Sequence, residues 1–147
     1  MRSVLFVDDS REDREVLRDL TQDWSDFRVV IEERGEDGVA RLGQEPFDCV
    51  VLDYLLQGED GLEIIGRVRD INPSVPVILL TGQGNETVEA ETLRAGVRRY
   101  LPKRGLTSDL LRSTVERAIL TAQTVAAEAL EDDAADEGEA QARSPSH

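Results

Sequence analysis

The sequence predicts an α/β fold in which helices cover both faces of a doubly wound parallel sheet. Five short apolar runs alternate strictly with segments of helical periodicity along the chain. The runs over 4–7, 49–52 and 77–80 are continuously apolar, which is typical of strands that are buried on both faces, whereas half-exposed strands alternate apolar and polar residues. At 147 residues, the chain is long enough for one domain with a single core.

The first half of the sequence contains three of the expected strands and two of the helices. The strands cover residues 4–7, 27–31 and 49–52, and a short helix spans residues 35–42. A longer helix begins after Ser10, whose side chain is a candidate N-cap. The expected apolar face of that helix consists of Val16, Leu17, Leu20 and Trp24.

The second half of the sequence continues the same alternation of helices and strands. A helix starts after Gly61 and stops before Pro73, because a proline disfavours a helical residue before it. Its apolar stripe consists of Leu62, Ile64, Ile65, Val68 and Ile71. A strand over 77–80, a polar helix over 86–95 and a strand over 97–101 follow.

The last expected helix leads into an acidic end of the chain. Thr107 or Ser108 caps this helix. Its apolar positions are Leu110, Leu111, Val115, Ile119 and Ala122. Beyond residue 127, too little apolar surface is left to offset the entropy of ordering. We therefore expect a domain over 1–127 and a disordered acidic tail over 128–147, with a tail that binds a partner as the alternative.

The charge and hydropathy of the chain exclude several classes of protein. The formal net charge of −14 disfavours nonspecific binding to nucleic acid or to an anionic membrane. No apolar run approaches the roughly 20 residues that a membrane-spanning helix needs. The first residues, Met1 to Val4, enter a strand directly and lack the apolar core of a signal peptide. We therefore expect a cytoplasmic protein.

Cysteine and histidine contribute little to any site in the expected domain. Cys49, the one cysteine, lies inside an apolar run and is expected to be a small core residue. The one histidine, His147, is the last residue of the chain. Histidine acid–base chemistry and histidine-rich metal sites are therefore not expected in the domain.

Polar residues follow four of the five apolar runs. Asp8 and Asp9 follow the first run, Asp53 the third, Thr81 the fourth and Lys103 the fifth. Open α/β sheets bind their ligands beyond the carboxyl ends of the strands. Three carboxylates, a hydroxyl and an ammonium are therefore expected on one rim of the sheet.

These residue types together predict a phosphoryl-transfer site. Three neighbouring carboxylates repel one another, and a hard divalent cation, preferably Mg²⁺, relieves that repulsion. Asp53 is the expected nucleophile, which would attack phosphorus and form an aspartyl phosphate. Thr81 and Lys103 supply a hydroxyl and a point charge for the phosphoryl oxygens.

Taken singly, each of these residues has a simpler interpretation. A lone aspartate at a strand end usually caps a helix, and a lone threonine or lysine usually lies on the surface. Their occurrence at successive strand ends favours a site. Of the 17 basic residues, Lys103 is the only lysine, which points the same way.

The motifs at Asp8, Asp9, Asp53, Thr81 and Lys103 resemble those of the receiver domain of two-component response regulators, of the single-domain, CheY-like type. The similarity covers about residues 2–125 in residue type, order and spacing. It implies a flavodoxin-like receiver topology with strand order 2-1-3-4-5 and five helices. It also implies signal transduction through a phosphorylated aspartate.

The resemblance assigns a role to each matching residue. It implies Asp53 as the phosphoacceptor and Asp9 and Asp53 as direct Mg²⁺ ligands. Asp8 would hold the metal through water, and the backbone carbonyl of Leu55 would add a ligand. Thr81 and Lys103 would bind the phosphoryl oxygens, in a catalytic role. Tyr100 matches the aromatic switch residue of the family, although as a residue alone it also fits a strand aromatic packed at a sheet edge.

Four positions near the site are expected to set this chain apart from other receiver domains. Gln57 stands where the family often has proline, and Arg104 stands where many receivers have a proline after a cis bond. We expect altered geometry of these loops, or a docking role for Arg104. Leu55 and Gln83 occupy positions that affect the access of water to the acyl phosphate in this family, and the bulk of Leu55 predicts slower hydrolysis.

The resemblance implies a signalling phosphoacceptor and not an enzyme with a separate substrate. We expect a stand-alone response regulator, and the alternative is a phosphorelay carrier that passes its phosphoryl group to a second histidine protein. A small-molecule phosphatase with an aspartate nucleophile is disfavoured, because such enzymes have an acid where this chain has Leu55. An adaptor that never carries phosphate is disfavoured because every site residue is present.

The expected partners are proteins. A histidine kinase or histidine phosphotransfer protein would supply the phosphoryl group. A target protein would bind the face formed by the fourth helix, fifth strand and fifth helix, where Arg94, Arg98 and Arg99 add local positive charge. Homodimer formation through the last helix is a further open alternative.

Overall fold

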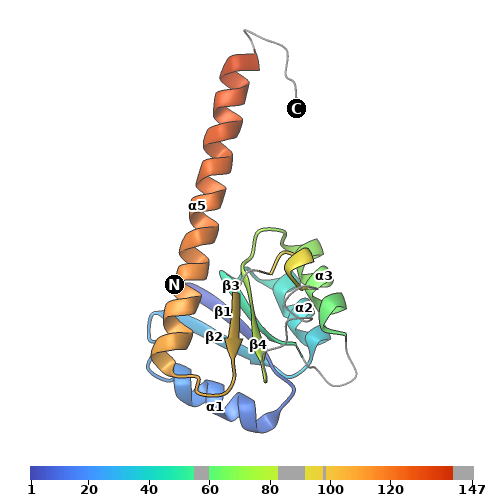
Figure 1. Ribbon diagram of the computed structural model, residues 1–147, viewed down its shortest axis with the longest axis vertical. Helices are drawn as coiled ribbons and strands as arrows, with labels where there is room; N and C mark the ends of the chain where they lie inside the picture. The colour runs from blue at the N-terminus through green and yellow to red at the C-terminus, as the bar shows by residue number, and fades with distance from the viewer. Residues whose placement is uncertain (55–59, 83–91, 98, 141–147) are drawn as a thin grey trace.

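The computed structural model describes residues 1–54, 60–82, 92–97 and 99–140, with side chains through residue 128 (Figure 1). A central parallel sheet has the strand order β2-β1-β3-β4-β5. Its strands are β1 (Arg2–Val7), β2 (Phe27–Glu32), β3 (Cys49–Asp53), β4 (Val77–Thr81) and β5 (Arg99–Pro102). The predicted doubly wound sheet and its strand order are confirmed.

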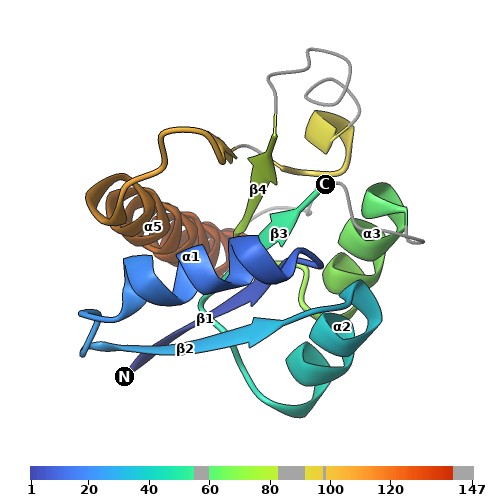
Figure 2. The same ribbon diagram turned by 90° about the horizontal axis from the view of Figure 1, so that it is seen from below.

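Helices cover both faces of this sheet. They are α1 (Arg11–Thr21), α2 (Gly35–Gln44), α3 (Gly61–Ile71) and α5 (Ser108–Ala140). Helices α1 and α5 lie on one face, and α2 and α3 lie on the other (Figure 2). Most of the helix expected over 86–95 falls outside the described residues, and residues 92–94 are helical.

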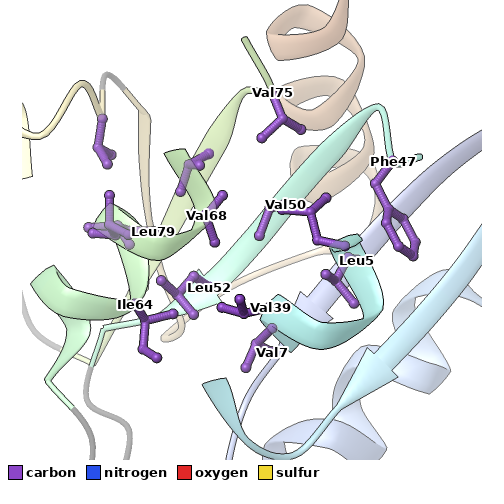
Figure 3. Close-up of a cluster of buried hydrophobic side chains, with 14 residues drawn as sticks. Leu5, Val7, Val39, Phe47, Val50, Leu52, Ile64, Val68, Val75 and Leu79 are labelled. Atoms are coloured by element: carbon purple, nitrogen blue, oxygen red, sulfur yellow. The ribbon is translucent and has the colours of Figure 1, made fainter. Parts of the chain in front are cut away.

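Two apolar clusters separated by the sheet form the core. Neighbouring residues of a strand point to opposite faces, so Leu5 packs with α2 and α3 while Phe6 packs with α1 and α5. Figure 3 shows the first cluster, in which Leu52 and Leu79 of the central strands meet Ile64 of α3. Strands β1, β3 and β4 are thus buried on both faces along most of their length.

The start of α1 agrees with the sequence prediction, but its end does not. The Ser10 hydroxyl oxygen accepts a hydrogen bond from the backbone N–H of Asp13 at 3.3 Å, so Ser10 is the N-cap. Trp24 lies beyond the end of α1 and is buried against Phe6 and Phe27. Because of its spacing from Leu20, Trp24 was predicted on the apolar face of this helix. Trp24 does pack in the same apolar cluster as Leu17, but from a position after the helix.

Helix α5 differs most from expectation. The Thr107 hydroxyl accepts a hydrogen bond from the backbone N–H of Leu110 at 3.1 Å, so Thr107 is the cap of the two candidates. The helix then continues to Ala140, far past the sheet (Figure 1). Residues 128–140 of the expected tail are therefore part of this helix, and the division into a domain over 1–127 and a tail stays a prediction. Low hydropathy argues against a packed core, but this segment is rich in alanine and glutamate, which favour a helix even without packing.

Candidate functional site

The carboxyl ends of β1 and β3 bring three aspartates together. Asp8 directly follows β1, and Asp53 is the last residue of β3, where it pairs in register with Leu80 of β4. One carboxylate oxygen each from Asp8, Asp9 and Asp53 lies within 4.8 Å of the others. Asp8 is 0% exposed and Asp53 4%. The expected cluster of carboxylates therefore exists, and it is largely shielded from water.

The backbone around Asp8 fixes its carboxylate in place. The N–H of Ser10 donates to Asp8 Oδ1 at 3.0 Å, and the N–H of Asp8 donates to the carbonyl of Glu32 at 3.0 Å. The other oxygen, Oδ2, receives no directed hydrogen bond from the described residues. Burial raises the pKa of Asp8 to about 6, and the nearby charge of Asp53 adds to this effect.

Lys103 joins the aspartates from the end of β5. Its backbone N–H donates to the carbonyl of Thr81 at 2.8 Å, which fixes the start of its side chain. Lys103 Nζ lies 2.9 Å from Asp53 Oδ2 and 3.0 Å from Asp8 Oδ2. Burial alone would lower the pKa of the ammonium, but its hydrogen bonds to Asp13 and Asp53 and its close contact with Asp8 outweigh burial and raise it. Lys103 is therefore charged and directed at the cluster.

The third carboxylate on Lys103 is one that the sequence analysis missed. Asp13, in the first turn of α1, accepts a hydrogen bond from Lys103 Nζ at 2.6 Å. The sequence did contain a signal for Asp13. It follows the N-cap Ser10 by three residues, so its backbone lies in the first turn of α1, close to the end of β1. Which side chain it meets depends on how α1 packs, and the sequence alone does not show that.

The cluster is suited to a hard divalent cation. Mg²⁺ prefers carboxylate oxygens, and Asp8, Asp9 and Asp53 offer three of them close together. The buried Asp8 Oδ2, with an ammonium 3.0 Å away but no directed hydrogen bond, is an oxygen with capacity for another positive partner. The residues present therefore fit the expected cofactor.

The two expected switch residues lie on neighbouring strands. Thr81, half-buried, ends β4 beside Pro102 of β5. The Tyr100 hydroxyl lies 2.8 Å from Thr92 Oγ1 and 3.2 Å from the carbonyl oxygen of Val97, to which it donates. Thr92 is 0% exposed, so this contact is buried at one end. Thr92 is a second residue that sequence reasoning missed, since it lies in a polar segment without a motif.

Some of the other residues singled out in the sequence lie in the described part of the chain, and some do not. Leu55, Gln57, Gln83 and Arg98 lie outside the described residues. The peptide bond that joins Lys103 to Arg104 is trans. Cys49 is buried, and burial raises the pKa of its thiol, which agrees with the predicted core role. No helix among the described residues combines the length and apolar character needed to cross a bilayer.

Comparison with known proteins agrees with this geometry. The profile of the response regulator receiver domain matches residues 4–116. The transcriptional regulatory protein ZraR of Salmonella typhimurium is 29% identical over 125 residues, which cover 85% of this chain and 28% of that protein. The transcriptional regulatory protein CpxR of Klebsiella pneumoniae is 33% identical over 103 residues, which cover 70% of this chain and 43% of that protein.

A solved structure supports the fold. The receiver domain protein (CheY-like) from Methanospirillum hungatei aligns with a TM-score of 0.76 at 18% identity, over 84% of this chain and 98% of that one. At this identity the likeness concerns the fold alone. The chain spans less than half the length of the two regulators it matches.

Proposed function

Because the chain belongs to the response regulator receiver domain family, whose members are signalling phosphoacceptors, we propose that Asp53 accepts a phosphoryl group from a partner's phosphohistidine. One observation carries this proposal. Asp53 lies 4% exposed at a strand end, clustered with Asp8 and Asp9, with an ammonium 2.9 Å from its Oδ2. A nucleophile, a cation site and a charge for the phosphoryl oxygens thus converge on one point.

The proposed transfer needs positioning more than covalent help from the protein. A carboxylate oxygen of Asp53 attacks phosphorus and forms a new O–P bond. The P–N bond to the partner's histidine breaks, and its electron pair returns to the imidazole nitrogen. Lys103 then faces the negative oxygens of the phosphoryl group, and the hydroxyl of Thr81 donates a hydrogen bond to one of them.

We assign the cofactor ligands as the family resemblance indicates. Asp9 and Asp53 would bind Mg²⁺ directly and Asp8 through water, together with the carbonyl of Leu55, which lies outside the described residues. When bound, Mg²⁺ neutralises charge on the carboxylates and on the transferred group. Lys103, whose Nζ lies 2.9 Å from Asp53 Oδ2, would neutralise a further part of that charge.

The proposed output is a change in a protein-binding face. Thr81 and Tyr100 would shift together on phosphorylation, and the surface around β5 and α5 would change its affinity for a target. Arg99 lies on this face, where its guanidinium donates to Thr121 Oγ1 at 3.0 Å. The receiver unit would cover residues 1–127, with direct target binding, onward transfer to a second histidine protein and homodimer formation as its possible outputs.

An intact-mass measurement tests the assignment of the phosphoacceptor. We expect the protein, with Mg²⁺ and acetyl phosphate, to gain one phosphoryl group, and Asp53→Asn to gain none. Asp23→Asn is the matched control, since Asp23 is an exposed acid away from the strand ends. No adduct on the wild-type protein, or a persistent adduct on Asp53→Asn, would defeat the proposal.

A further inference from the structure

Asp13 approaches Lys103 more closely than either strand-end carboxylate does. The distance from Lys103 Nζ is 2.6 Å to Asp13, against 2.9 Å to Asp53 and 3.0 Å to Asp8. Building on the proposed function of Asp53, we propose that Asp13 is a positioning residue that holds Lys103 in the resting state. The incoming phosphoryl group then competes with Asp13 for that ammonium.

The carboxylates around Lys103 compete with a phosphoryl group for its ammonium. An ammonium has three N–H donors and no acceptor. Lys103 directs hydrogen bonds at Asp13 and Asp53 and keeps a close charge contact with Asp8. Two donors are thus used in hydrogen bonds, and the carboxylate of Asp8 faces the ammonium as a third partner. A phosphoryl oxygen that approaches the ammonium from the side of one of these carboxylates must replace it.

Asp13 is the partner that is released at the lowest cost. The side chain of Asp13 is 40% exposed, whereas that of Asp8 is 0% and that of Asp53 5%. A carboxylate that regains water loses little when its partner leaves, but a buried one is left unsatisfied. A cavity of about 30 Å³ borders both Asp13 and Lys103, which is room for about one water molecule. Water can therefore occupy the position that the ammonium leaves.

The negative charge of Asp13 also opposes phosphorylation of Asp53. It is a fourth carboxylate beside a site that must receive a phosphoryl dianion, so it repels the incoming group. Removing this charge frees one donor of Lys103 and lowers the repulsion. We expect Asp13→Asn to form the Asp53 adduct faster and to keep it longer, each by about two- to fivefold, the range that a partly exposed ion pair supports.

The single lysine of the chain allows the contact to be observed without any phosphodonor. A sample labelled with ¹⁵N-lysine gives one side-chain Nζ resonance, that of Lys103. We expect Asp13→Asn to shift this resonance and Glu12→Gln to leave it in place. Glu12 is the matched control, because it is an exposed acid in the same first turn of α1 and is not among the three carboxylate partners of Lys103. An unchanged resonance in Asp13→Asn would overturn the proposal.

The kinetic test uses the full chain with Mg²⁺ and acetyl phosphate. Formation and loss of the adduct are followed by intact mass for wild type, Asp13→Asn, Asp13→Glu and Glu12→Gln. We expect Asp13→Glu, which keeps the charge, to remain near wild type. Equal rates in Asp13→Asn and Glu12→Gln, or a shorter adduct lifetime in Asp13→Asn, would refute the role of Asp13 alone. Absence of an adduct in wild type would instead refute the proposed function of Asp53.

Discussion

Gly61 is the position where one added methyl group should disturb both stability and the site. A Cβ built there lies 2.7 Å from the backbone oxygen of Tyr54 and 2.9 Å from its ring carbon Cδ2. Tyr54 directly follows Asp53, so it cannot move aside without shifting the end of β3. We therefore predict that Gly61→Ala destabilises the protein and slows phosphorylation of Asp53.

The size of the effect follows from two opposing terms. Overpacking of this kind costs about 1–3 kcal/mol. Replacing glycine by alanine in a helix returns about 0.5–1 kcal/mol. The net loss for Gly61→Ala should thus be roughly 1 kcal/mol and at most about 2.5 kcal/mol, and a loss of 1 kcal/mol lowers Tm by about 2–4 °C for a protein of this size.

Gly66 in the same helix is the matched control. A Cβ at Gly66 meets nothing within 4 Å, so Gly66→Ala should stabilise the protein by about 0.5–1 kcal/mol. Urea unfolding of both variants measures the free energies, and intact mass measures adduct formation. A Gly61→Ala variant as stable as Gly66→Ala would show that the close approach of Gly61 to Tyr54 does not limit the size of the side chain at position 61.

Three further predictions concern pH, the Tyr100 contact and the cation. The hydrogen bond from Arg112 is the main cause that lowers the pKa of Asp26 from 3.8 to about 2. The ionised Asp26 therefore stabilises the folded protein fully above pH 4, and this stabilisation is lost as the pH falls through 2. The difference in unfolding free energy between wild type and Asp26→Asn should therefore narrow between pH 6 and pH 2 in urea titrations. Thr92→Val removes the 2.8 Å partner of the Tyr100 hydroxyl and should cost about 1 kcal/mol in urea unfolding, while Thr92→Ser should lose less. Mg²⁺ at ten times its Kd should stabilise the wild type by about 1.4 kcal/mol in thermal unfolding, and Asp9→Asn should largely lose this gain.

The strands and the core of the site could be predicted because their signals are local. A continuous apolar run followed by a polar residue defines both a buried strand and the point where it ends. Asp8, Asp53 and Lys103 therefore needed only the rule that parallel strands end on one rim. Thr81 was placed by the same rule, and its backbone carbonyl does hold the N–H of Lys103.

The contacts that the sequence did not reveal depend on how helices pack. Asp13 and Lys103 are 90 residues apart, and no periodicity links them. The Thr92–Tyr100 contact likewise depends on how Thr92 packs against β5. The length of α5 was missed for another reason, because hydropathy reports on burial and does not report on helix propensity.

The charge balance of the site ties cation binding to phosphorylation. Asp8, Asp9, Asp13 and Asp53 bring four carboxylates to one ammonium, and the raised pKa of Asp8 shows that burial already works against its charged form. A phosphoryl group adds further negative charge at Asp53, so transfer should be opposed until a divalent cation has bound. The two events should therefore be coupled, with Mg²⁺ raising the rate of transfer, and Asp13→Asn should reduce the Mg²⁺ concentration needed for half of the maximal rate. If wild type and Asp13→Asn need the same Mg²⁺ concentration, the charge of Asp13 does not influence cation binding, despite its 2.6 Å contact with Lys103.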